Sequence, residues 1–195
     1  MKRAYAPPAI SAAPKWGDPS TIEVWAVNDR DDSFDGTAEL DLWALDGEKK
    51  PFASSAVRIA PRSAAKVGEW PIAAFAAGRA FSPADSFLRM RLVGGLEVSN
   101  EWMFDLFMNM NLARTNIKTT FAEKDGKFHV TLSAGKPAFF VWANVWGTRG
   151  EFDDNSITLY PGEPRTITFA PKIPGLSLDA FKRSFSVMHL RETYR

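Results

Sequence analysis

The chain has 195 residues, of which 45% are hydrophobic and 13% aromatic, so it carries enough apolar side chains for folded domains with cores of their own. Its 24 Lys and Arg residues are interspersed with 23 Asp and Glu residues, and the formal net charge of +1 argues against a nucleic-acid binder. The absence of cysteine excludes disulfides, thiol nucleophiles and cysteine metal sites, and it leaves the cellular compartment open.

The first half of the chain has the pattern of short strands separated by turn residues. Apolar and polar residues alternate over 21–27 and again over 37–44, on either side of the polar loop 29–36, and these two strands could pair. Asp46-Gly47 indicates a turn, 57–59 a short strand and 87–92 another strand, before Gly94-Gly95 opens a hairpin into residues 96–107. This spacing predicts an immunoglobulin-like (Ig-like) β-sandwich over residues 15–110.

Alternation is lost over residues 109–115, where we place a domain boundary. A strand is expected over 117–123, a hairpin turn over 124–127, and a returning strand with Phe128, Val130 and Leu132 on its buried face. The aromatic run 138–145 predicts a central strand buried on both faces. Residues 171–180 are expected to form a loop with one helical turn, and 184–190 a last strand. The pattern predicts a second, small Ig-like β-sandwich over residues 111–195.

The stretch from residue 152 to residue 169 combines turn and strand signals. Asp153, Asp154 and Asn155 have short polar side chains that bond the local backbone and tolerate a turn. Pro161-Gly162 presets φ at one turn position and permits a positive φ at the next. Residues 165–169 then alternate as in a half-buried strand, so the segment is predicted to form a strand, a turn and a second strand.

This stretch resembles the F-S-D-N-Y-F-x-L-x-P-G-E signature of β-mannosidase-like members of glycoside hydrolase family 2. Asp153 replaces the usual Ser, and Ser156-Ile157 replace an aromatic pair. Residues 2–8 resemble the K-R-x-Y/F-A-P-V peptide that leaves the catalytic barrel of those enzymes, and V-N-D at 27–29 and L-D-G at 45–47 follow in the same order as in the family. The signature residues that match are Phe152, Asp154, Asn155, Leu159, Pro161, Gly162 and Glu163.

The resemblance implies that the fold is all-β, with two tandem Ig-like β-sandwich domains at the C-terminal end of such an enzyme and residues 1–14 as a linker from a barrel outside this chain. It implies a non-catalytic, structural role in an enzyme that hydrolyses terminal β-linked mannose with retention, through a covalent intermediate. In that family both catalytic glutamates lie on a (β/α)8 barrel, and no glutamate here lies in a segment resembling those motifs, so no catalytic residue is carried over.

The implied partner is the catalytic barrel of the same polypeptide, with mannose-containing glycans as a further candidate. We expect no cofactor and no nucleic-acid partner. We also expect no membrane partner, since no apolar run approaches the 18 residues of a membrane-spanning helix. Exo-β-glucosaminidases and endo-acting mannosidases of the family share this domain layout, so the resemblance defines the family better than the substrate.

Metal-binding and nucleophilic residues are few. His129 alternates with Phe128 and Val130 and is expected on a solvent face, and His189 falls in the last strand, so neither has a zinc ligand set or a catalytic triad around it. The acidic loop 28–36 invites a calcium interpretation, but an EF-hand register places Leu42 where the bidentate Glu must stand. A solvated hairpin loop is favoured there, and we expect no metal site.

Tryptophan offers the remaining route to a binding function. Trp25 and Trp43 fall on the polar phase of their strands and could form an exposed pair that binds glycan or docks on the barrel. Trp142 and Trp146 are expected in the core, since large aromatic residues are highly buried on average. The exposed pair is the basis of an alternative function, an independent carbohydrate-binding β-sandwich module.

Overall fold

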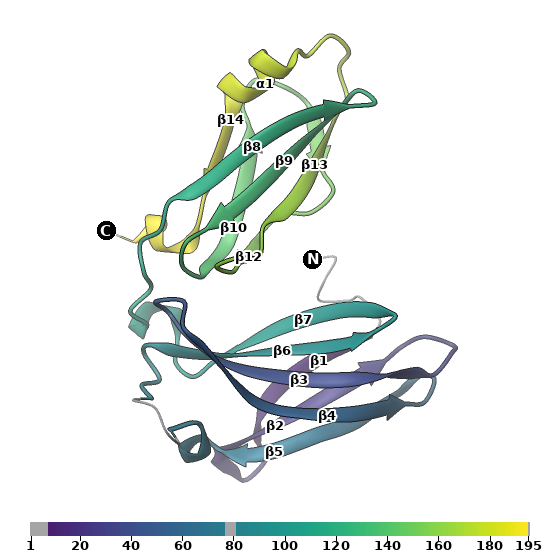
Figure 1. Ribbon diagram of the computed structural model, residues 1–195, viewed down its shortest axis with the longest axis vertical. Coiled ribbons are helices and arrows are strands. Elements are labelled where there is room, and N and C mark those ends of the chain that lie inside the picture. Colours follow the sequence, from purple (N-terminus) through teal and green to yellow (C-terminus); the bar gives the residue numbers. More distant parts are fainter. Residues whose placement is uncertain (1–7, 77–80, 195) are drawn as a thin grey trace. The chain divides into compact units, whose positions relative to one another are not determined.

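The computed structural model describes residues 8–76 and 81–194, and it divides the chain into two units, residues 1–111 and 112–195 (Figure 1). Each unit is a β-sandwich of one three-stranded and one four-stranded antiparallel sheet, as the sequence predicts. The division predicted after residue 110 falls after Asn111 in the structure.

The first unit contains strands β1 to β7. Its three-stranded sheet has the order β1-β2-β5, with β1 at Ala9–Lys15, β2 at Asp18–Asn28 and β5 at Ser63–Pro71. Its four-stranded sheet has the order β4-β3-β6-β7, with β4 at Lys49–Ile59, β3 at Phe34–Ala44, β6 at Ser86–Gly94 and β7 at Leu96–Met103. Short 3₁₀ helices follow at Ile72–Ala76 (η1) and Phe107–Asn109 (η2).

Alternation along the strands builds the first core. Three alternate residues of β2 (Ile22, Val24, Ala26) and three of β6 (Leu88, Met90, Leu92) are fully buried between the sheets, and Phe75 of η1 closes the core at 1% exposure. The alternation predicted for 21–27 is therefore confirmed, whereas over 87–92 the opposite face of β6 is buried as well, with Phe87 at 0% and Arg89 at 5% exposure.

Two expectations for the first unit differ from the structure. Strands β2 and β3 do not pair, because β2 lies between β1 and β5 while β3 lies between β4 and β6. Residues 9–14 are not a linker: they belong to β1, which pairs with β2 from Ala9↔Val27 to Pro14↔Ile22. Alanine and proline give β1 a weak strand signal, although its backbone completes the edge of the sheet. Residues 2–7 of the barrel-exit resemblance lie outside the described residues.

The second unit contains strands β8 to β14. Its four-stranded sheet has the order β11-β13-β9-β8, with β11 at Gly150–Phe152, β13 at Arg165–Pro171, β9 at Lys127–Ala134 and β8 at Ile117–Lys124. Its three-stranded sheet has the order β12-β10-β14, with β12 at Ile157–Leu159, β10 at Ala138–Val145 and β14 at Phe185–Met188. Helix α1 at Leu178–Ser184 precedes β14, and a 3₁₀ helix, η3, follows it at Leu190–Thr193.

Helix α1 places one aromatic side chain at the centre of the second core. The Ser177 hydroxyl caps the helix by accepting from the Ala180 N–H. Phe181 is fully buried, and its ring stacks on Phe128 of β9 at 4.4 Å and lies 5.4 Å from Phe169 of β13. The helix therefore supplies core rather than a surface element. Within residues 8–76 and 81–194, no helix is long and apolar enough to cross a membrane.

Strand β10 has the predicted position but not the predicted burial. Ala138, Val141 and Ala143 face the core, whereas Phe140 and Trp142 on the opposite face are 49% and 52% exposed. An aromatic run is typical of strands buried on both faces, but the residues of β10 in the core cluster are Ala138, Val141, Ala143 and Val145, and of its three aromatic residues Phe139 alone is buried, at 4%. The expectation that Trp142 and Trp146 lie in the core is wrong.

Candidate functional site

The signature segment lies where the chain of the second unit crosses from one sheet to the other. Strand β11 belongs to the four-stranded sheet and β12 to the three-stranded sheet, so residues 153–156 form the crossing. Asp153 ties the crossing to β13: its N–H donates to the Thr168 carbonyl at 2.9 Å, and its Oδ1 accepts the Thr168 N–H at 2.8 Å. Asn155 ties it to β10, with two 2.8 Å hydrogen bonds to the backbone of Ala143.

The other signature residues shape the two ends of the crossing. Phe152 packs 5.0 Å from the Phe169 ring, and Leu159 is fully buried. Gly162 has a φ of 77° in the turn in which the Glu163 N–H donates to the Tyr160 carbonyl at 3.1 Å, a conformation that glycine adopts without strain. Asp154 lies 3.8 Å from Arg165. These contacts give the signature a role in holding the sandwich together.

The structure places the two candidate tryptophans apart. Trp25 lies on β2 in the three-stranded sheet, while Trp43 lies on β3 in the four-stranded sheet and is only 2% exposed. The Trp43 ring stacks on Phe87 at 6.2 Å, with the Arg89 guanidinium 5.9 Å and the Lys49 ammonium 5.5 Å from its centroid. The predicted exposed pair does not form, since the two residues share neither a sheet nor an exposed surface.

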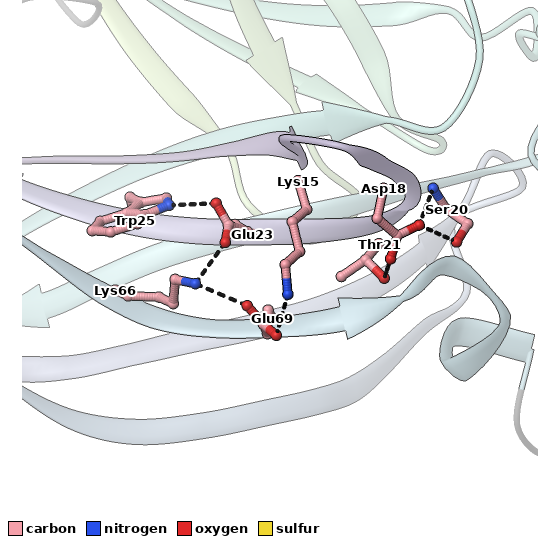
Figure 2. A network of polar contacts seen from close by, with 8 residues as sticks. All are labelled: Lys15, Asp18, Ser20, Thr21, Glu23, Trp25, Lys66 and Glu69. Atoms are coloured by element: carbon pink, nitrogen blue, oxygen red, sulfur yellow. Dashed lines mark hydrogen bonds and ion pairs between the residues drawn. The ribbon is translucent and has the colours of Figure 1, made fainter.

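Trp25 instead belongs to a charged network on the outer face of the β1-β2-β5 sheet (Figure 2). The Lys66 ammonium bonds Glu23 at 2.5 Å and Glu69 at 2.8 Å, and Lys15 bonds the second oxygen of Glu69 at 2.9 Å. The Trp25 indole N–H donates to Glu23 at 3.3 Å, and Lys66 lies 5.4 Å from the ring centroid. Each carboxylate in this network therefore has a cation or an N–H beside it.

These contacts lower the pKa of both carboxyl groups. Hydrogen bonds from Lys15 and Lys66 lower the pKa of Glu69 from its ordinary 4.5 to about 2, and the hydrogen bond from Lys66 lowers that of Glu23. A glycosidase acid needs the opposite, a carboxyl whose pKa is raised so that it holds a proton to donate. The network is suited to a fixed, charge-compensated surface and not to proton transfer.

The turn between β1 and β2 is organised by one further carboxylate (Figure 2). Asp18 accepts hydrogen bonds from the Ser20 hydroxyl at 2.5 Å, the Ser20 N–H at 3.1 Å and the Thr21 hydroxyl at 2.7 Å. These bonds lower the pKa of Asp18. Asp18 therefore stabilises the start of β2.

A shallow hollow of about 420 Å³ lies over the other sheet of the first unit. Arg91 of β6 bonds Glu39 of β3 at 2.6 Å, and it lies 3.5 Å from Asp41 and 3.7 Å from Glu97. The two carboxylates of β3 thus share one guanidinium. The lining residues come from three neighbouring strands: Glu39, Asp41, Lys49, Pro51, Phe52, Ala53, Ser54 and Arg91.

The two histidines and the acidic loop 28–36 make hydrogen bonds that hold the fold together. His129 is half-buried beside the Thr168 hydroxyl at 3.2 Å, and His189 is 2% exposed, with its Nε2 3.1 Å from the Thr115 carbonyl. Asn28, fully buried, donates from its amide to the Asp32 carbonyl at 2.8 Å and so closes the acidic loop. Among the described residues, no three His, Cys, Asp or Glu side chains are grouped as metal ligands would be.

The second unit carries an exposed aromatic row that was not predicted from the sequence. Phe140, Trp142 and Trp146 lie two and four residues apart along β10 and its extension, with exposures of 49%, 52% and 69%. Alanine at 138 and 143 and valine at 141 and 145 form the inward set that packs on the core. The small size of these inward residues, against the bulky outward ones, was the signal that could have revealed the row.

Comparison with known proteins relates both units to mannosidases. Residues 20–104 match the family model of the mannosidase Ig/CBM-like domain, and residues 112–193 match the Ig mannosidase family, an Ig-fold domain. A search of curated proteins gave no match.

Among solved structures, a β-D-mannosidase from Dictyoglomus thermophilum matches 97% of this chain with a TM-score of 0.77 and 18% identity. The chain spans 22% of the length of that mannosidase, and the likeness shows a shared fold. A transglutaminase from red sea bream matches 95% of the chain and 29% of its own length at 10% identity, with a TM-score of only 0.34.

Proposed function

Since this chain consists of two mannosidase-type Ig-like domains in tandem, we propose that it is a non-catalytic accessory part of a glycoside hydrolase that cleaves terminal β-mannosidic linkages. The hydrolase is of the family 2 type, and its catalytic glutamates lie in a barrel domain of the same polypeptide, outside these 195 residues. The two domains pack against that barrel and keep the larger enzyme folded.

The observation that carries this proposal is the pair of family matches, one on each unit. A single match would fit one mannosidase-type domain recombined with something else. Two different mannosidase-type families, at 20–104 and 112–193, cover both sandwiches in the order of a tandem pair.

The chemistry of the described carboxylates supports the non-catalytic role. Glu23 and Glu69 both bond the Lys66 ammonium, and Glu39 and Asp41 share Arg91. Retaining and inverting glycosidases need one carboxyl that donates a proton and a second that attacks or activates water. In the Glu23–Glu69 pair, hydrogen bonds from lysine lower the pKa of both carboxyl groups, which favours two ionised carboxylates instead.

The alternative function is an independent carbohydrate-binding module based on Trp25 and Trp43. It would need both rings on one exposed surface, and the two rings do not share one. Trp43 is buried against Phe87, and Trp25 is in the other sheet with Lys66 beside its ring.

The non-catalytic role is tested by assaying the purified 195-residue chain with an aryl β-mannoside. We expect no hydrolysis above the buffer rate at any pH between about 4 and 8, the range in which carboxylate-based glycosidases titrate. Turnover that persists through repeated purification, and that co-migrates with the chain on size exclusion, would contradict the proposal.

A further inference from the structure

The outer face of the β12-β10-β14 sheet carries four large apolar side chains that are about half exposed or more. They are Phe140 (49%), Trp142 (52%), Trp146 (69%) and Met188 (46%). Exposed apolar side chains that gather on one face commonly mark a binding surface.

The side chains form a row along β10. Residues 140, 142, 144 and 146 alternate with the buried 141, 143 and 145, and the Trp146 N–H donates to the Ser184 carbonyl at 2.9 Å, which extends the ladder beyond Val145. At the rise of a strand, Trp142 and Trp146 are about 13 Å apart along the sheet. Met188 lies opposite Trp142 in the register with β14. The row is therefore linear and follows the strand.

Two features of the backbone and side chains fix the row in place. The Trp146 indole N–H donates to the Ser186 hydroxyl at 3.0 Å, which holds the orientation of the ring. Phe140 has a φ of 50°, in the left-handed region that bulky residues rarely adopt, at the irregularity between Ala138 and Val141 in the pairing of β10 with β12. Irregularities of this kind re-aim side chains, and strained backbone is concentrated at functional sites.

The polar groups on this face are uncharged. Asn144 lies opposite Ser186 between the two tryptophan positions, and Thr158 is the outward residue of β12 between buried Ile157 and Leu159. The outward strand positions 140, 142, 144, 158, 186 and 188 include no Asp, Glu, Lys or Arg. The outer face of the β1-β2-β5 sheet, by contrast, carries Lys15, Glu23, Lys66 and Glu69. The face on β10 is therefore suited to a neutral ligand with both apolar and hydrogen-bonding surfaces.

We propose that this face of the second unit binds a neutral polysaccharide chain, with hexopyranose rings stacked on Trp142 and Trp146 and hydroxyl groups bonded by Asn144. A pyranose ring presents C–H groups of slight positive charge on its face, and the face of an aromatic ring is the negative end of its quadrupole. Its hydroxyl groups match an amide that both donates and accepts. A row of rings along a strand suits a linear polymer better than a single sugar.

The choice of β-1,4-mannan as the first ligand to test rests on the proposed function, whereas the binding face itself does not. We would measure retardation of the purified chain in native gels containing soluble β-1,4-mannan, with β-glucan and galactan gels in parallel. Binding to mannan is expected, and Trp142→Ala and Trp146→Ala should each weaken it about tenfold or more, since central aromatic residues dominate binding faces.

Trp16→Ala is the matched control, because Trp16 is 99% exposed in the turn between β1 and β2 and lies in the other unit. This variant should be retarded as strongly as the unchanged chain. Circular dichroism and thermal unfolding of each variant separate lost binding from lost fold, and Trp142→Phe, which keeps an aromatic face, should retain part of the binding.

The outcomes are distinct. Retardation by one of the three glycans, weakened in Trp142→Ala and Trp146→Ala, supports the binding face. If that glycan is β-glucan or galactan, the binding face stands and mannan is not its ligand, while the assay with an aryl β-mannoside tests the proposed function separately. No retardation by any glycan, or retardation that the two variants leave unchanged, would overturn the inference. Self-association that the variants abolish, without sugar binding, would also overturn it and identify a protein contact.

Discussion

The side-chain amide of Asn155 pairs with the backbone of Ala143 as a neighbouring strand would. Its Nδ2 donates to the Ala143 carbonyl and its Oδ1 accepts the Ala143 N–H, both at 2.8 Å. Val141 pairs with Ile157 in the β10–β12 ladder, so Asn155 stands at the next paired position opposite Ala143. Among side chains, the amide offers a donor and an acceptor like a peptide group, and this explains Asn at the crossing between sheets.

Replacing Asn155 with Ala should destabilise the second unit by about 2 kcal/mol. The change leaves the Ala143 N–H and carbonyl without this partner in a partly buried position, and each unsatisfied group carries a desolvation penalty. Urea denaturation followed by far-ultraviolet circular dichroism measures the loss. Asn116→Ala, the same change at an exposed residue of the same unit, is the control. Equal midpoints for the two variants would show that the pairing does not stabilise the fold.

The carboxyl group of Glu69 should titrate near pH 2. Its pKa lies below the ordinary 4.5 because Lys15 and Lys66 bond the ionised form. A lowered folded-state pKa means that the contribution of Glu69 to stability is complete above about pH 4.5 and is lost as the pH falls towards 2. Carbon-detected NMR titration measures the midpoint, which should rise in a Lys15→Met, Lys66→Met variant and in high salt. A midpoint of about 4.5 in the unchanged chain would contradict the network.

Phe181 should be the most sensitive aromatic position of the second core. Phe181→Ala removes a fully buried ring that stacks on Phe128, and the loss of contacts together with the cavity should cost about 3–5 kcal/mol. Phe181→Leu should cost less, because it fills part of the space. Phe140→Ala makes the same deletion at a half-exposed ring and should have a clearly smaller effect on the unfolding midpoint. Similar losses at 181 and 140 would mean that α1 is not part of the core.

Asn28, and not a metal ion, should hold the acidic loop. Its buried amide donates to the carbonyls of Asp32 at 2.8 Å and Ala60 at 3.2 Å, and it accepts the Arg30 N–H at 3.2 Å. Asn28→Ala should therefore lower stability by about 1–3 kcal/mol, while Asp29→Ala, at an exposed neighbour, should be nearly neutral. Thermal unfolding with and without millimolar calcium completes the test, and a calcium-dependent rise in the midpoint would show that the loop binds the ion.

Strict alternation made much of the fold predictable. Ile22, Val24 and Ala26 on β2 and Leu88, Met90 and Leu92 on β6 made their strands recognisable because every second residue is aliphatic and fully buried, with polar residues such as Glu23 and Arg91 among those between them. Strands β1 and β5 were not predicted, because alanine and proline fill most of β1 and β5 mixes alanine, glycine and charged residues. Each of them pairs with one edge of β2. Pairing between distant segments leaves little trace in a local pattern.

The burial of the aromatic residues was harder to predict. Alternation shows on which face of a strand a side chain lies, but it does not show whether other side chains cover that face. Trp43 falls on the polar phase of β3 but is buried by contact with Phe87 and neighbouring long side chains. Trp142 falls in a run that is apolar on both phases but lies on the uncovered face of its sheet. The signature residues were identified from their resemblance to a family motif. That they connect the two sheets is visible only in the structure, from the register of β10, β12 and β13.

The membership of this chain in a larger mannoside-cleaving enzyme is tested most directly by precipitating the native polypeptide from the source organism. An antibody raised against the 195-residue chain should recover a band several times heavier than 21.7 kDa, and the precipitate should hydrolyse an aryl β-mannoside. A band near 21.7 kDa with no hydrolytic activity in the precipitate would contradict the proposed function and identify an independent protein.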